Sequence, residues 1–221
     1  MTVEFTLLWA ALTAVAAAWL GTRVWRASLP DSPTERIVSS AAAGLLVGRI
    51  AEMIGQGINP ITNLSDLLII RGGVSVPAAT VAAIGTLWWT SNRDLSVVDS
   101  FSAPALVGLA GWHAGCLWRS ACLGTVSDLP WALAEPGSTI TRHPVELYAA
   151  VGLVLASLLV SRIPPKPGLR SAAALGLAAL VRLVTEPFRL SVTGGPVFWY
   201  VVGLSLALLA GTALVWRHRE I

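Results

Sequence analysis

Long apolar runs separated by short polar breaks dominate the pattern of this chain. A bilayer core of about 30 Å needs roughly 20 mostly apolar residues in helical form. The stretches that qualify are residues 5–24, 37–55, 73–90, 99–118, 145–162, 169–188 and 197–216. The breaks carry turn-forming residues, as in the proline-rich segment Pro164–Gly168. The pattern therefore predicts an all-α polytopic membrane protein with about seven transmembrane helices.

The composition agrees with this class. Of the 221 residues, 55% are hydrophobic and only 12% are charged, whereas soluble domains carry about 25% charged residues. The basic residues are scattered along the chain, so the net charge of +3 does not indicate nucleic-acid binding. No repeat and no linker-like tract interrupts the sequence, and we expect residues 1–221 to form a single transmembrane domain in the lipid bilayer.

Arginine and lysine residues in the breaks predict the orientation of the chain. The side with more of them carries Arg23, Arg26, Arg36, Arg93, Arg162, Lys166, Arg170, Arg217 and Arg219. The opposite side carries Arg71, Arg119, Arg142 and Arg189. The positive-inside rule places the richer side in the cytoplasm, with the N-terminus outside and the C-terminus in the cytoplasm. The first span is not expected to be a cleaved signal peptide, because Met1–Glu4 lacks a basic segment.

The polar residues of the spans gather at one depth in this topology. Arg49, His113 and Arg182 lie toward the outer ends of their spans, and Arg142 and His143 lie at the same level. A charged side chain inside a span costs about 2.5–3.5 kcal/mol on insertion scales, so it usually faces a cavity or a partner. The chemistry is therefore expected in the outer half of the membrane.

Arg182, Glu186 and Arg189 follow i, i+4, i+7 spacing and share one helix face. One interpretation is that such residues form internal ion pairs that lock helices together. The other is that the guanidinium groups grip the phosphate of a lipid head group through paired hydrogen bonds. The convergence of all the polar sites at one depth favours the second interpretation.

Several of the remaining polar residues have structural interpretations beside the functional ones. His113 can hydrogen-bond a neighbouring helix, His143 can support a loop turn, and Tyr148 can anchor the chain at the interface. Cys116 and Cys122 are interpreted as packing residues. Two cysteines do not make a disulfide framework, and their spacing fits no zinc site, so no metal is expected.

Segments along nearly the whole chain resemble the prolipoprotein diacylglyceryl transferase family of seven-span bacterial enzymes. Arg142-His143-Pro144-Val145-Glu146-Leu147-Tyr148 is similar to the family's RHPxQLYE segment. Gly48-Arg49-Ile50 resembles its GGRIGY segment. The stretch from Arg182 to Arg189 resembles its RxxxEFxR segment, with both arginines and the glutamate in place. Asp99 and the stretch from Gly115 to Gly124 are similar to its region around the fourth span.

This resemblance implies an enzyme that transfers diacylglycerol from phosphatidylglycerol to the thiol of a lipobox cysteine in a prolipoprotein signal peptide. It implies no cofactor, and a location in the bacterial cell (inner) membrane with the site facing the outer leaflet. The nucleophile belongs to the substrate. Arginines can bind the phosphate and offset charge on the departing glycerol phosphate, and a histidine can favour the thiolate. The catalytic candidates are Arg182, His113 and His143; the substrate-binding candidates are Arg49, Arg119, Arg142, Tyr148, Glu186 and Arg189.

The chain also departs from the family's segments. Pro77 stands at the histidine of the GGxxxHGG segment. In the GRxGNFxNGE segment, His113 stands at the arginine and Ala121 at the glutamate, while Cys116 and Arg119 stand at the asparagines. A diverged paralogue that binds phospholipid head groups without catalysis, or a transferase with another acceptor, therefore stays an alternative.

A seven-span transporter or receptor is a further alternative. A retinal protein is excluded, because its Schiff base needs a buried lysine and the only lysine is Lys166 in a proline-rich break. A proton or ion carrier needs acidic residues along a through-path, and the inner half of the spans lacks them. The residues therefore favour the transferase.

Overall fold

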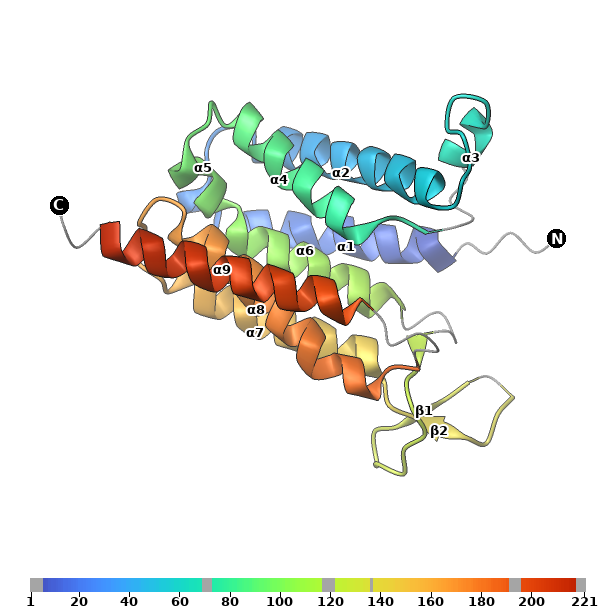
Figure 1. Cartoon of the computed structure of the whole chain (residues 1–221). Coiled ribbons are helices and arrows are strands. Elements are labelled where there is room, and N and C mark those ends of the chain that lie inside the picture. The colour runs from blue at the N-terminus through green and yellow to red at the C-terminus, as the bar shows by residue number, and fades with distance from the viewer. Residues whose placement is uncertain (1–5, 69–72, 117–121, 136, 191–195, 218–221) are drawn as a thin grey trace. The chain divides into compact units, whose positions relative to one another are not determined.

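The computed structural model describes residues 6–68, 73–116, 122–135, 137–190 and 196–217 (Figure 1). The longer helices are α1 (Thr6–Val24), α2 (Pro33–Gly55), α4 (Val76–Thr90), α6 (Ser102–Gly115), α7 (Val145–Ser161), α8 (Leu169–Thr185) and α9 (Val197–Arg217). The short ones are α3 (Leu64–Leu68), α5 (Leu95–Ser100), and the 3-10 helices η1 (Arg26–Ser28) and η4 (Glu186–Phe188). Strands β1 (Leu133–Ala134) and β2 (Thr141–Arg142) pair antiparallel, with Leu133 opposite Arg142.

The all-α prediction is confirmed, since a two-stranded hairpin is the only sheet in the described residues. Within the same residues, three segments are long and apolar enough to cross a membrane: Pro33–Gly55, Leu169–Phe188 and Val197–Arg217. Val76–Thr90 and Val145–Ser161 are shorter apolar helices. Every predicted apolar stretch contains a helix, while the number of spans and their orientation stay predictions.

The stretch 99–118 differs most from its prediction, because two helices share it. α5 ends at Ser100 and α6 begins at Ser102, with Phe101 between them. Pro104 lies in the first turn of α6. Its ring would clash with the carbonyl four residues earlier in a continuous helix, so the chain restarts at this point.

The chain divides into two compact units, which are described separately. Unit 1 comprises Met1–Leu29 and Asp99–Ile221, and unit 2 comprises Pro30–Val98. In unit 2, α2 packs against α4. In unit 1, α6 contacts α1, α7 and α8, while α8 also contacts α7 and α9 (Figure 1). That residues 1–221 form a single domain stays a prediction.

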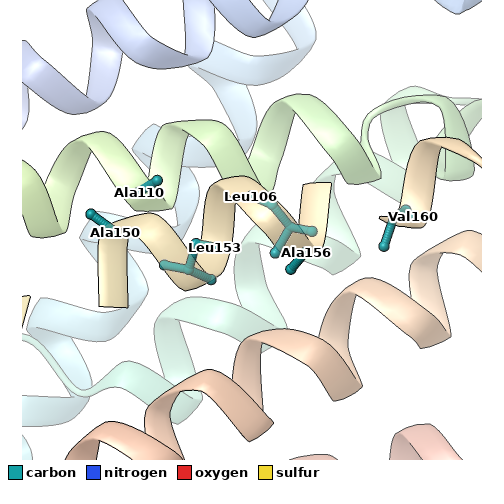
Figure 2. Close-up of a cluster of buried hydrophobic side chains, with 6 residues drawn as sticks. All are labelled: Leu106, Ala110, Ala150, Leu153, Ala156 and Val160. Carbon is teal, nitrogen blue, oxygen red and sulfur yellow. The ribbon is translucent and has the colours of Figure 1, made fainter. Parts of the chain in front are cut away.

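The core of unit 1 lies between α6 and α7 (Figure 2). Its buried side chains are Leu106, Ala110, Ala150, Leu153, Ala156 and Val160. The members on α7 recur every three or four residues and therefore occupy one helix face. The three alanines among them let the helix backbones approach, which matters where lipid supplies no hydrophobic drive between helices.

α1 packs against α6 at similarly close range. A Cβ atom added to Gly111 would lie 2.5 Å from both the Ala17 side chain and the Thr13 carbonyl oxygen. Only glycine allows this approach of the two backbones. The packing on α1 and α7 fixes α6, whose last turn carries His113.

Candidate active site

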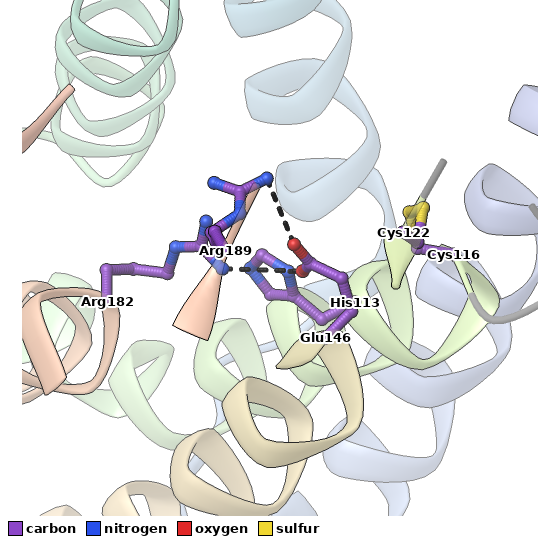
Figure 3. Close-up of a disulfide and its surroundings, with 6 residues drawn as sticks. All are labelled: His113, Cys116, Cys122, Glu146, Arg182 and Arg189. Carbon is purple, nitrogen blue, oxygen red and sulfur yellow. Dashed lines mark hydrogen bonds and ion pairs between the residues drawn. A yellow bond between two sulfur atoms is a disulfide. The ribbon is translucent and has the colours of Figure 1, made fainter. Parts of the chain in front are cut away.

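The ends of three helices in unit 1 bring titratable side chains together. His113 lies in the last turn of α6, Glu146 in the first turn of α7 and Arg182 in the last turn of α8. Arg189 follows directly after η4. Because α7 runs antiparallel to both of its neighbours, these helix ends meet at one level, and the four side chains point toward one another (Figure 3).

Glu146 is the centre of this arrangement, because its carboxylate contacts the other three side chains. Its Oε2 atom is hydrogen-bonded to Nδ1 of His113 and lies 3.3 Å from Nη1 of Arg182. Its Oε1 atom lies 3.1 Å from Nη2 of Arg189. The side chains of Glu146, Arg182 and His113 are 5%, 9% and 12% exposed. One buried carboxylate thus gathers a histidine and two arginines.

Glu186 adds a second carboxylate. Its Oε2 atom lies 3.5 Å from Nη1 of Arg189 and 4.0 Å from Nη2 of Arg182. Both carboxylate oxygens of Glu186 are buried, and neither accepts a hydrogen bond from the described part of the chain. The Glu146 cluster is defined as His113, Glu146, Arg182, Glu186 and Arg189. Its guanidinium and carboxylate groups are equal in number, so their formal charges balance.

Charge balance explains why this cluster tolerates burial. An unpaired ion in a low-dielectric interior is strongly unfavourable, whereas a paired and hydrogen-bonded one is tolerated. Removing one partner of a buried pair typically costs about 3–5 kcal/mol, because the other charge is left uncompensated. The ion pairs expected from the spacing of Arg182, Glu186 and Arg189 are therefore present, and phosphate binding by the same groups stays a prediction.

The cluster is closed on one side and more open on another. Nε of Arg182 donates a hydrogen bond to the Tyr200 hydroxyl at 3.4 Å, and its guanidinium carbon lies 5.6 Å from the centre of that ring. Tyr200 belongs to α9, which thereby covers Arg182. Arg189 has a side chain that is 35% exposed. Arg189 is therefore the most exposed member of the Glu146 cluster.

A group of aromatic side chains surrounds His143. Its ring centroid lies 5.1 Å from that of Phe188 and 6.0 Å from that of Tyr148. Nδ1 of His143 lies 3.2 Å from the Tyr148 hydroxyl, which also accepts a hydrogen bond from Nε1 of Trp131 at 2.8 Å. These contacts give His143 and Tyr148 defined positions in the structure, next to but separate from the Glu146 cluster.

A cavity of 590 Å³ opens beside this aromatic group. Gly152 of α7 and Val181 and Val184 of α8 form much of its wall, and His143 and Tyr148 also line it. A lining of this kind can accommodate a hydrocarbon chain.

Arg142 fastens the loop that leads into α7. Its Nη1 atom donates a hydrogen bond to the Gly124 carbonyl oxygen at 3.3 Å. The Gly124 N–H donates in turn to the carbonyl oxygen of His143 at 2.8 Å. The described contacts of Arg142 are thus with the main chain, and its predicted part in substrate binding is untested.

Arg49 belongs to unit 2, where its guanidinium group binds main-chain oxygens. Nε and Nη2 donate hydrogen bonds to the Asp66 carbonyl at 3.0 and 2.9 Å, and Nη1 donates to the Gly73 carbonyl at 2.9 Å. Arg49 is 3% exposed. It therefore links α2 to the chain on both sides of residues 69–72.

Arg119, Ala121 and Pro77 are the remaining positions that were compared with the family's segments. Arg119 and Ala121 lie outside the described residues. Pro77 lies in the first turn of α4. A proline is well accommodated there, because the first N–H groups of a helix have no partner within the helix.

The interpretation of Cys116 and Cys122 as packing residues was wrong. The two are joined by a disulfide, with their Cα atoms 5.8 Å apart (Figure 3). Two cysteines are too few for a multi-bridge framework, but that argument does not exclude one local bridge. Cys116 ends the helical segment of α6, and the chain returns to it within six residues. In the described residues, no group of three or more His, Cys, Asp or Glu side chains is placed to hold a metal ion.

Glu146 is the site residue that the sequence prediction omitted. The signal was present, because an acidic residue stands in the first turn of an apolar span, where the family's RHPxQLYE segment has an amide. A carboxylate at such a position calls for a partner. Its partners His113 and Arg182 lie 33 and 36 residues away in sequence, beyond the reach of any helical spacing rule.

The sequence is similar to one family of known proteins. The family model described as prolipoprotein diacylglyceryl transferase matches residues 3–217. Proteins named phosphatidylglycerol–prolipoprotein diacylglyceryl transferase are similar over most of their length. The protein from Vibrio parahaemolyticus is 30% identical over 227 residues, covering 92% of this chain and 82% of the relative. That from Vibrio atlanticus is 28% identical over the same shares, and that from Pseudomonas aeruginosa strain PAO1 is 26% identical over 95% and 87%.

Proposed function

Since this chain belongs to the prolipoprotein diacylglyceryl transferase family, we propose that it transfers diacylglycerol from phosphatidylglycerol to the thiol of a prolipoprotein lipobox cysteine. The observation that carries the proposal is the Glu146 cluster. Two guanidinium groups from one family segment and an imidazole from another converge within hydrogen-bonding reach of one buried carboxylate. The reaction needs this combination, because a phosphate must be held while a thiol loses its proton.

The transfer requires one bond to form and one to break. The acceptor sulfur attacks the glyceryl carbon that carries the phosphate oxygen, a C–S bond forms, and the C–O bond breaks with its electron pair on the departing glycerol phosphate. Negative charge grows on that leaving oxygen. Arg182 and Arg189 are placed to stabilise it, because a guanidinium group donates two parallel hydrogen bonds to phosphate oxygens. His113 and His143 are the proposed catalytic histidines.

The proposed substrate-binding residues differ in how much the structure supports them. Arg189 and Glu186 belong to the Glu146 cluster, and Arg189 is its most exposed member. Tyr148 lines the apolar cavity beside it, which suits an acyl chain of the lipid. The proposed contributions of Arg49, Arg119 and Arg142 rest on the family's segments alone.

We further propose a single transmembrane domain of seven spans in the bacterial inner membrane, with an external N-terminus and a cytoplasmic C-terminus. The meeting of the α6, α7 and α8 ends at the Glu146 cluster supports a site at one membrane face. The distribution of arginines and lysines supports the outer face. Reporter fusions after Arg26 and Arg219 should report cytoplasm, and a fusion after Trp131 should report the outside. An external signal after Arg219 contradicts the topology.

Transfer is tested directly with the purified protein, vesicles containing phosphatidylglycerol and a lipobox peptide. Mass spectrometry should find one diacylglyceryl thioether on the peptide cysteine. A peptide with serine in place of that cysteine, and vesicles of phosphatidylethanolamine, are the controls and should give no product. A wild-type protein that binds the lipid but makes no thioether contradicts the proposal.

A second candidate function is favoured by the charge balance of the cluster. Arg182 and Arg189 both contact Glu146, so they do not form an excess of positive charge awaiting a phosphate. This arrangement suits a diverged family member that binds a phospholipid head group without transfer to the lipobox cysteine, or that uses another acceptor. The assay separates the two: head-group binding without thioether favours this second candidate.

A further inference from the structure

The contact between His113 and Glu146 goes beyond what phosphate binding needs. Family members with the GRxGNFxNGE segment place a permanently charged arginine where this chain has His113. A guanidinium group donates hydrogen bonds but accepts none, so it cannot act as a base in proteins. Imidazole can do both, and in this chain a carboxylate is bonded to one of its nitrogens. Compared with the family's segments, His113 replaces an arginine and Glu146 replaces a glutamine, and these two residues contact each other.

Glu146 sets the state of the imidazole ring. A carboxylate paired with two guanidinium groups can only accept hydrogen bonds. Its contact with Nδ1 of His113 therefore requires that nitrogen to carry the hydrogen, which leaves the lone pair of the ring on Nε2. A carboxylate that holds one ring nitrogen fixes the tautomer and the orientation of the other. Arg182 and Arg189 contact the same carboxylate and hold it in position. The ring is thus held with its basic nitrogen directed away from Glu146.

We propose that His113 is the base that removes the proton of the acceptor thiol, and that Glu146 is its positioning residue. The inference rests on the proposed function, and it names the residues that activate the acceptor. The S–H proton passes to Nε2 of His113, the sulfur forms the C–S bond, and the C–O bond to glycerol phosphate breaks. The proton then leaves His113 for the departing phosphate or water, which restores the neutral ring.

The other groups around the His113–Glu146 pair, called the dyad below, have different roles. Arg182 and Arg189 are permanent cations and cannot take a proton. The buried carboxylate of Glu186 lies 3.5 Å from Arg189 and 4.0 Å from Arg182, and it balances their charge. Tyr200 accepts a hydrogen bond from Arg182. Among the described members of the cluster, His113 is the one with a side-chain nitrogen that can accept a proton.

The kinetic test compares two acceptors that differ in their need for a base. A selenol ionises far more readily than a thiol, so a selenocysteine lipobox peptide reaches the site as the anion. With the cysteine peptide, His113→Gln should lower kcat by about a hundred- to ten-thousand-fold. Glu146→Gln should lower it by up to about ten-thousandfold, the effect of the same change at the carboxylate that orients the histidine of a Ser-His-Asp triad. With the selenocysteine peptide, both losses should shrink to less than about tenfold.

Two further readouts separate positioning from a structural role. Glu146→Gln releases two guanidinium groups from their counter-ion, so KM for phosphatidylglycerol should stay the same or fall while kcat falls. The exposed Glu35→Gln in unit 2 is the matched control and should leave both parameters unchanged. Equal losses with the thiol and selenol peptides overturn the proposal, because the residues then act on something other than the acceptor proton.

NMR spectroscopy tests the contact between His113 and Glu146 independently of turnover. The chain has three histidines, His113, His143 and His218, which simplifies assignment after ¹⁵N-histidine labelling. The wild type should show a proton on Nδ1 of His113 that is lost or shifted in Glu146→Gln. An active transferase without that proton overturns the dyad and leaves the proposed function intact. A protein with the proton but no transfer to either peptide overturns the proposed function, and the base role with it.

Discussion

Two arginines are buried in the part of the chain that the structure describes, one in each unit, and they satisfy their charge in different ways. Arg49 is 3% exposed and Arg182 is 7% exposed. All three donor nitrogens of Arg49 bind main-chain carbonyl oxygens at 2.9–3.0 Å. The contacts of Arg182 are longer, from 3.3 Å to Glu146 to 4.0 Å to Glu186, and they are with side chains.

The difference indicates which arginine is available for chemistry. Main-chain carbonyls cannot leave their positions without deforming the fold, so the guanidinium group of Arg49 is committed to holding unit 2 together. Carboxylate side chains can turn aside, and the hydrogen bonds of Arg182 are not at their shortest range. An incoming phosphate can therefore compete for Arg182. Burial alone does not distinguish the two residues, whereas the chemical identity of their partners does.

Among variants that test this comparison, Arg182→Lys should have the largest effect on transfer. The substitution keeps the charge but replaces a planar fork with a point charge, which cannot form two parallel bonds to a phosphate. Loss of one preorganised donor typically costs about 2.7–4 kcal/mol, or roughly a hundred- to a thousandfold in kcat. The thioether assay measures this loss, while thermal unfolding in detergent checks that the variant is folded.

The matched control is Arg170→Lys at the opposite end of α8. Nε of Arg170 donates a hydrogen bond to the Ile163 carbonyl oxygen at 2.9 Å, so the side chain is also engaged in the fold. Its transfer rate should equal that of the wild type. If Arg182→Lys is as active as the wild type, the proposed role of Arg182 is wrong.

Arg49→Lys should produce the opposite pattern, with a smaller effect. One ammonium group cannot reach both carbonyl oxygens that the guanidinium group now binds, so buried main-chain acceptors lose their partners. A buried acceptor without a partner costs about 1–3 kcal/mol of the free energy of unfolding. We expect a lower unfolding temperature and a nearly unchanged transfer rate per folded molecule. A lost transfer rate at an unchanged unfolding temperature would instead place Arg49 at the lipid head group.

The sequence predicted the helices better than it predicted the site. Apolar runs determine where helices form, and the predicted stretch 145–162 coincides closely with α7, Val145–Ser161. The family was predicted correctly, because its motif residues are local in sequence. The exception among the helices was the stretch 99–118, where Pro104 in the first turn of α6 separates it from α5.

The contacts within the site were less accessible to sequence reasoning. Which carboxylate serves His113 and Arg182 depends on the rotation of three helices about their axes, and no spacing rule within one helix fixes that. The disulfide between Cys116 and Cys122 depends likewise on a return of the chain after α6. Arg49 looked equivalent to Arg182 in hydropathy and depth, and only the positions of the Asp66 and Gly73 carbonyls distinguish them.

The smallest expected effect compares the two tyrosines of the chain, Tyr148 and Tyr200. Tyr148→Phe removes the acceptor for Trp131 Nε1 and the hydroxyl beside Nδ1 of His143, but Trp131 is 56% exposed, so water can replace the hydroxyl on that side. The change should lower the free energy of unfolding by about 0.5–1.5 kcal/mol, the net value of one hydrogen bond. Transfer should fall by no more than about threefold, or about 0.7 kcal/mol in the barrier, because the phenyl ring stays in the cavity wall and His143 keeps its contact with Phe188.

Tyr200→Phe is the matched variant, because its hydroxyl accepts a hydrogen bond from Arg182 rather than from a residue outside the Glu146 cluster. Its phenyl ring keeps the packing of α9 over the guanidinium group but lets Arg182 turn, so the transfer rate should fall further than in Tyr148→Phe. Michaelis–Menten measurements on both variants decide the order. A phenol that serves proton transfer contributes about a hundredfold or more to the rate. A loss of that size in Tyr148→Phe, with Tyr200→Phe unaffected, would therefore assign the proton transfer to Tyr148 and His143 and not to the Glu146 cluster.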